Sequence, residues 1–260
     1  MIRHRTVLIG FATLLVAVTL VANIGCARKA KPMLTCEEYY ELGMRNLESK
    51  KWLKAQEMFE AITYNYPGCD LVDDAQYMLG ETYFRQGLYI EAQFEFRRVV
   101  EDFRLSDRME DAQYHMALAA HKQSHPAALD QTPTEEAIFR FQQYLDDFPN
   151  GKYAVEARNY IREGRKKLAQ KDYTAGRFYH RLDYEEAALI YLNHVINEYP
   201  DSEEWVERAR YLKSVILVDR DQPQEALVLL RTINQDQVKP KLREDINRLI
   251  TKIQNPERRR

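Results

Sequence analysis

The fold of this chain is decided by residues 74–100, which read DAQYMLGETYFRQGLYIEAQFEFRRVV. Small residues stand at Gly80 and, 12 positions later, at Ala92. Two antiparallel helices can approach closely where such small residues face each other. Phe96 follows the alanine by four residues, so it lies on the same helix face and can fill the gap beside the crossing. The stretch therefore predicts one helix–turn–helix unit.

The same order of residues recurs along the chain. Gly43 and Ala55 repeat the 12-residue spacing, and Gly43 precedes Gly80 by 37 residues. At the same offset, residues 111–114 repeat the DAQY of residues 74–77. A fourth and a fifth unit follow with this pattern: Gly176, Tyr179, Ala188 and Leu192, then Leu212, Ala226, Leu230 and Ile233. This order matches the tetratricopeptide repeat (TPR) pattern.

No such unit can bury its apolar face alone, so the units must stack. We expect an all-α, TPR-type helical solenoid of about five helix–turn–helix repeats over residues 36–254, closed by a capping helix at residues 239–253. An inserted loop is expected at residues 125–133 in the third unit, bracketed by Pro126 and Pro133. Residues 153–171 read as an N-terminal extension of the first helix of the fourth unit, and residues 255–260 as a flexible tail.

The N-terminus has the pattern of an export signal. A basic start is followed by the mostly apolar residues 7–24 and by Gly25 and Cys26. Residues 1–25 resemble a bacterial lipoprotein signal peptide, which implies that Cys26 becomes the lipidated first residue and that residues 26–35 form a short tether. An uncleaved anchor is the alternative, since 18 apolar residues are near the minimum for spanning a bilayer. Both interpretations export the rest of the chain.

Composition and motifs argue against several function classes. The formal net charge is -2, from 38 basic and 40 acidic residues of mixed order, which does not suggest nucleic acid as a partner. We find no phosphate-binding loop, serine-hydrolase elbow or zinc-protease motif, so we expect no enzymatic activity and no cofactor. His121 and His125 have helical i, i+4 spacing, but a pair lacks the further ligands that zinc requires, and we expect no metal site.

The repeat register predicts which residues face the concave side. The fifth position of every first helix is a tyrosine: Tyr40, Tyr77, Tyr114, Tyr173 and Tyr211. Aromatic faces and phenol hydroxyls suit an extended peptide. We expect a peptide-binding or substrate-binding groove that includes Tyr40, Met44, Tyr77, Glu81, Phe84, Tyr114 and His121. A tyrosine ladder that only packs the inner wall is the alternative.

Cys36 and Cys69 stand at repeat positions one and thirty-four of the first unit. Antiparallel helices bring the start of the first helix close to the end of the second, and an exported chain meets oxidising conditions. We expect a disulfide between them. Two separate thiols are the alternative, because bridging needs Cα atoms within about 7 Å.

The order of these features resembles the BamD family of outer-membrane-protein assembly lipoproteins over essentially the whole chain. Local matches are residues 37–40 (EEYY), 96–100 (FRRVV) and 199–202 (YPDS). The resemblance implies a non-catalytic scaffold, lipid-anchored in the outer membrane on its periplasmic face. It also implies three sets of partners: unfolded outer-membrane proteins at the N-terminal repeats, the POTRA region of the BamA insertase at the C-terminal repeats, and other assembly-complex lipoproteins. The alternative is another periplasmic TPR lipoprotein, either a secretin pilotin or a cell-envelope division factor.

Overall fold

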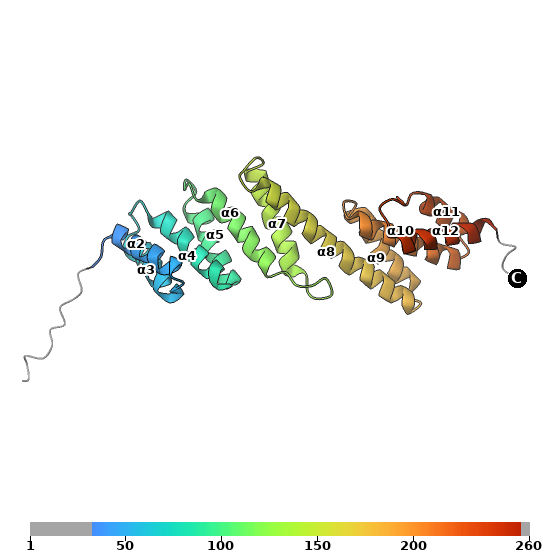
Figure 1. Ribbon diagram of the computed structural model, residues 1–260, viewed down its shortest axis with the longest axis horizontal. Coiled ribbons are helices and arrows are strands. Elements are labelled where there is room, and N and C mark those ends of the chain that lie inside the picture. The colour runs from blue at the N-terminus through green and yellow to red at the C-terminus, as the bar shows by residue number, and fades with distance from the viewer. Residues whose placement is uncertain (1–32, 256–260) are drawn as a thin grey trace, which may run out of the picture. The chain divides into compact units, whose positions relative to one another are not determined.

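In the computed structural model, residues 33–255 are described, and all of their regular elements are α-helices. The helices belong to the unit that begins at Cys36. Cys26 and the expected signal peptide, residues 1–25, lie outside the described residues. The helices are labelled in Figure 1: α2 (Cys36–Glu48), α3 (Trp52–Asn65), α4 (Val72–Gln86), α5 (Tyr89–Asp102), α6 (Met109–Lys122), α7 (Thr132–Asp147), α8 (Ala154–Arg181), α9 (Glu185–Glu198), α10 (Glu203–Asp219), α11 (Pro223–Arg231) and α12 (Pro240–Gln254).

The helices form hairpins that follow one another in chain order (Figure 1). Each helix packs mainly against its neighbours in sequence, α8 also contacts α10, and α12 packs against α10 and α11. The prediction of an all-α, TPR-like solenoid is therefore confirmed. No helix within residues 33–255 has both the length and the apolar character needed to cross a membrane.

Small residues set the helix crossings, as the spacing predicts. An added Cβ at Gly80 would lie 2.8 Å from the ring of Phe96, and one at Gly43 would lie 2.6 Å from the ring of Phe59. Both rings are fully buried. In each hairpin, the phenylalanine ring of the second helix therefore occupies the space that a larger residue on the first helix would need.

Glycine and proline mark helix ends at positions that suit their backbone conformations. Gly87 ends α4 with a φ of 80°, a left-handed conformation that glycine adopts without steric cost. Pro133 lies in the first turn of α7, where its missing N–H is not needed. The loop between α6 and α7 therefore covers residues 123–131, and the expected boundary at Pro133 was wrong. The side-chain amide of Gln131 closes this loop by donating to the carbonyl oxygens of Pro126 and Leu129, at 2.8 and 3.1 Å.

The third and fourth units are joined by one long helix. Helix α8 has 28 residues, whereas the other first helices, α2, α4, α6 and α10, have 13, 15, 14 and 17. It begins at Ala154, one residue after the expected start of the extension. Its first part packs against α7 and its later part against α9 and α10.

Candidate peptide-binding groove

The structure buries two of the tyrosines that the register assigns to the groove. Tyr77 in α4 is 6% exposed and Tyr114 in α6 is 7% exposed, whereas Tyr40 in α2 is half-buried. Side chains with so little accessible surface offer little contact area to a peptide. For Tyr77 and Tyr114, the burial favours the wall-packing alternative.

Tyr77 is enclosed by groups from its own unit and the next. Its ring lies 5.4 Å from the ring of Phe96, and its hydroxyl lies 3.2 Å from Nδ1 of His115. The guanidinium of Arg108 lies over the Tyr77 ring at 5.3 Å, in cation–π range. Burial raises the pKa of Tyr77 well above its ordinary range, so the hydroxyl stays neutral and available for hydrogen bonding.

Tyr114 is covered by a residue from beyond its own hairpin. The ring of Tyr153 stacks on it with centroids 4.0 Å apart and planes inclined by 12°. Burial raises the pKa of Tyr114 to about 12. The residue that covers Tyr114 stands just before α8, so the next segment of the solenoid completes this part of the wall.

The repeated DAQY motif has a role that sequence reasoning missed. Asp74 accepts a hydrogen bond from Nε of Arg108 at 2.5 Å. Asp111, the equivalent aspartate one repeat later, accepts from Nζ of Lys152 at 2.6 Å and from the hydroxyl of Tyr153 at 2.7 Å. In both cases the cation stands just before the first helix of the following unit. The aspartate therefore ties one repeat to the next, and its recurrence at the 37-residue offset was the signal available in the sequence.

The electrostatics of Asp111 follow from this pairing. Burial alone would raise the pKa of Asp111, but the hydrogen bonds from Lys152 and Tyr153 outweigh it and hold that pKa below its usual range. The carboxylate is thus charged and paired at neutral pH. The pairing stabilises the junction between α6 and the start of α8.

The other expected groove residues keep some accessible surface. Met44 and Phe84 are half-buried, and the Phe84 ring lies 5.3 Å from the ring of Tyr89. Glu81 pairs with Arg85 at 2.6 Å on the next turn of α4. Among the residues that the sequence assigned to the groove, the surface open to a ligand is therefore contributed by half-buried side chains and not by Tyr77 or Tyr114.

His121 is half-buried beside Tyr160, with ring centroids 4.5 Å apart. Burial lowers the pKa of His121, and the nearby Lys167 adds to the effect, so its imidazole is neutral at pH 7. His125 is exposed in the loop before α7. Within residues 33–255, no three His, Cys, Asp or Glu side chains are grouped so that they could hold a metal ion.

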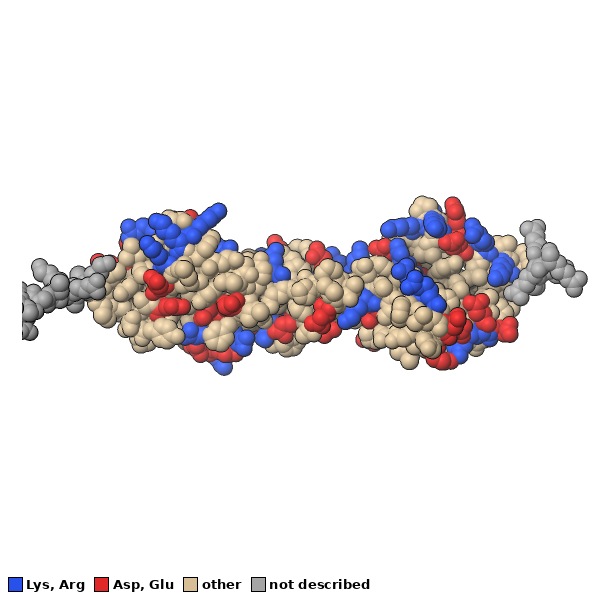
Figure 2. All heavy atoms as spheres, turned by 90° about the horizontal axis from the view of Figure 1, so that it is seen from below, with Lys and Arg blue, Asp and Glu red and all other residues tan. Residues whose placement is uncertain are grey.

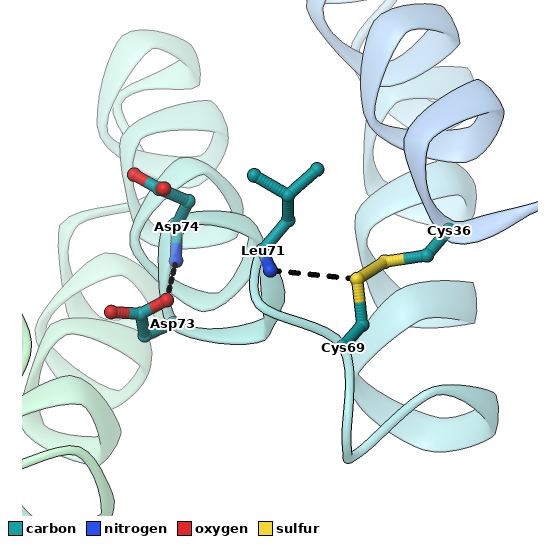
Figure 3. The surroundings of a disulfide bond; sticks show 5 residues. All are labelled: Cys36, Cys69, Leu71, Asp73 and Asp74. Atoms are coloured by element: carbon teal, nitrogen blue, oxygen red, sulfur yellow. Dashed lines mark hydrogen bonds between the residues drawn. A yellow bond between two sulfur atoms is a disulfide. The ribbon is translucent and has the colours of Figure 1, made fainter.

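A disulfide joins Cys36, in the first turn of α2, to Cys69, in the turn that leads into α4 (Figure 3). Their Cα atoms are 6.6 Å apart. The backbone N–H of Leu71 donates to the sulfur of Cys69 at 3.4 Å, which places the bond against the entry to α4. The bond therefore closes the first unit around α3.

The face drawn in Figure 2 carries both acidic and basic side chains along the solenoid, separated by uncharged surface. Neither sign dominates this face. A polyanionic partner such as nucleic acid would require a continuous basic surface, which this face does not have.

Comparisons with known proteins point to one family. A family model described as "YfiO: Outer membrane lipoprotein" matches residues 32–216. The chain is similar to the outer membrane protein assembly factor BamD of Rickettsia prowazekii (strain Madrid E), with 29% identity over 168 residues, which cover 65% of this chain and 67% of the relative. It is also similar to the BamD of Caulobacter vibrioides, with 27% identity over 175 residues, which cover 65% of this chain and 57% of that relative's length.

Two solved structures share a more distant similarity. The TPR2AB domain of yeast Sti1 in its pHSP90 complex has 13% identity and a TM-score of 0.42, over 84% of this chain and 98% of that one. A tetratricopeptide repeat protein of Parabacteroides merdae has 12% identity and a TM-score of 0.38, over 83% of this chain and 98% of that one.

Proposed function

The chain belongs to the YfiO family of outer membrane lipoproteins, and from this premise we propose that it is a non-catalytic scaffold of outer-membrane β-barrel assembly. In this role it binds unfolded outer-membrane proteins through its N-terminal repeats and the POTRA region of the BamA insertase through its C-terminal repeats. Lipidation at Cys26 holds it on the periplasmic face of the outer membrane. The observation that carries the proposal is the family match over residues 32–216, which runs from α2 into α10.

The N-terminal hairpins supply a surface suited to an extended chain. Half-buried Tyr40, Met44 and Phe84 present apolar and aromatic area, and Glu81 adds a polar group beside them. Unfolded barrel strands alternate apolar and polar side chains, so one face of such a strand can contact the aromatic groups. The buried Tyr77 and Tyr114 support this surface from below without contacting the substrate.

The stiffness of the wall matters for such a role. The pair Asp74–Arg108 joins the second unit to the third, and the pair Asp111–Lys152 joins the third unit to the start of α8, so both pairs help to hold the spacing of the wall in this part of the solenoid. A preorganised surface loses less conformational entropy when it binds a flexible substrate. The two pairs therefore favour a wall that is ordered before the substrate binds.

The proposal is tested by affinity purification of the tagged protein from crosslinked, solubilised envelopes. We expect a POTRA-containing barrel protein to co-purify. A variant that lacks α10–α12 should lose this partner if the C-terminal repeats make the contact, while circular dichroism reports whether the remaining helices fold. Recovery of a secretin or of division proteins without any POTRA protein would contradict the proposal and support the pilotin or division alternative.

A further inference from the structure

A groove of about 690 Å³ lies between α7, the first part of α8 and the turn that connects α9 to α10. It is separate from the expected peptide groove of the N-terminal units and shares none of those residues. No local sequence pattern indicates this groove, since α7 and the α9–α10 turn, which line it together, are distant along the chain.

The length of α8 explains why the groove exists. Because α8 has 28 residues, α7 packs along its first part and α9 along its later part. At the floor, α7 and α8 are in close contact, since an added Cβ at Gly164 would lie 2.8 Å from Ile138. The far side of the space is bounded by Tyr199 and Asp201 from the α9–α10 turn.

The walls of this groove are largely apolar. Ile138 and Phe139 line it from α7, Ile161 and Leu168 from α8, and Tyr199 from the far side. Phe139 is 55% exposed, which leaves much of a large aromatic ring in contact with solvent. Burying this ring against a partner would remove that apolar area from water.

Three arginines of α8 reach the groove: Arg158, Arg162 and Arg165, at i, i+4 and i+7 on one helix face. Two of them are held within the chain. Nη2 of Arg158 donates to the carbonyl oxygen of Pro149 at 2.7 Å, and Arg165 donates to both carboxylate oxygens of Asp201 at 2.8 to 3.0 Å.

Arg162, between these two, is exposed. It donates to the amide oxygen of Asn159 at 3.2 Å and forms no ion pair within the described part of the chain. Of the two carboxylates in the lining, Asp201 is paired with Arg165 and also lies within electrostatic range of Arg162, which helps to lower the pKa of Asp201, and Glu135 lines the groove from α7. With Arg158, Arg162 and Glu135 remaining, the lining has an excess of one positive charge.

We propose that this groove binds an extended segment of a partner protein in which a carboxylate side chain is adjacent to an aromatic or branched aliphatic side chain. The carboxylate pairs with the guanidinium of Arg162, whose planar donors match its two oxygens. The apolar neighbour packs on Phe139 and Tyr199. This inference rests on the groove's own residues and does not depend on the assembly role proposed above.

The test uses a fluorescein-labelled peptide, Gly-Asp-Phe-Asp-Leu-Gly, titrated with the full chain and followed by fluorescence anisotropy. We expect saturable binding that weakens when the two Asp are replaced by Asn, or when Phe and Leu are replaced by Ala. Arg162→Gln and Phe139→Ala should each raise Kd by roughly fivefold or more. Arg162→Gln should also remove the preference for the Asp peptide over its Asn analogue, because the positive charge that pairs with the carboxylate is removed.

Matched controls come from the same structure. Arg177→Gln removes an exposed arginine elsewhere on α8. Ile190→Ala removes an exposed apolar side chain from α9. Ile190 follows the repeat alanine Ala188 by two residues, as Phe139 follows Ala137. Both controls should leave Kd unchanged. Absence of saturable binding, equal effects from the controls, or unchanged affinity in folded Arg162→Gln and Phe139→Ala would each overturn the inference.

Discussion

Replacing Tyr77 by Ala should destabilise the protein strongly. The ring is 6% exposed and lies against Phe96 and His115, with centroids 5.4 and 5.8 Å apart. Truncation of a buried aromatic residue to Ala costs about 3–5 kcal/mol of unfolding free energy. Tyr77→Phe keeps the ring and removes only the hydroxyl that lies 3.2 Å from Nδ1 of His115, for which about 0.5–1.5 kcal/mol is expected. The difference between the two variants, roughly 3 kcal/mol, measures the packing of the ring.

Urea unfolding followed by circular dichroism gives the free energies of both Tyr77 variants. On the same samples, anisotropy measures binding of a C-terminal β-strand peptide from an outer-membrane protein under conditions where each variant is folded. We expect folded Tyr77→Ala to bind nearly as well as the wild type, whereas Phe84→Ala, at a half-buried position, should weaken binding more than it lowers stability. If Tyr77→Ala lost less than about 1 kcal/mol but its peptide affinity collapsed, Tyr77 would contact the substrate and the packing argument would be refuted.

Three further predictions concern the architecture. Gly80→Ala adds a Cβ 2.8 Å from the ring of Phe96 and should cost about 1–3 kcal/mol, whereas Gly68→Ala, with no atom within 4 Å of the added Cβ, should be nearly neutral in the same urea assay. Reducing the disulfide, whose cysteines are 33 residues apart, should lower the unfolding free energy by roughly 4 kcal/mol in the chain-entropy model, and two free thiols in the unreduced, denatured protein would show that the bond does not form. Pairing with Lys152 lowers the folded-state pKa of Asp111, so the stability that Asp111 contributes is present above its unfolded pKa of about 3.9 and is lost as the pH falls through the lower folded pKa. Asp111→Asn should therefore flatten the curve of unfolding free energy against pH in this acidic range. An unchanged curve would contradict the pairing of Asp111 with Lys152.

Local packing explains why the repeat architecture was predictable. Gly80, Ala92 and Phe96 lie within one hairpin, so their spacing records a contact between chain segments that are close in sequence. The same spacing then locates the other units. The boundary at Pro133 was less predictable, because proline is equally compatible with a loop and with the first turn of a helix.

Whether the groove tyrosines are buried or exposed depends on contacts between units, which no local sequence pattern indicates. The register places Tyr114 on the inner side of the solenoid, but the ring of Tyr153, 39 residues later, stacks on Tyr114 and completes its burial. Likewise, the irregular repeat spacing predicted the extension of α8, whereas the groove beside α8 requires Tyr199 from the α9–α10 turn. Residues that are covered by a neighbouring unit can be assigned only once the units are stacked.

The central claim, that this protein serves outer-membrane β-barrel assembly, is tested most directly by depleting it from cells and measuring folded barrel proteins in the outer membrane. Folded barrels resist unfolding in detergent without heating, so gel mobility with and without boiling separates them from unassembled chains. We expect the folded fraction of newly made barrels to fall and unfolded barrel chains to accumulate, while soluble periplasmic proteins keep their normal levels. Normal assembly of every barrel protein after complete depletion would contradict the account.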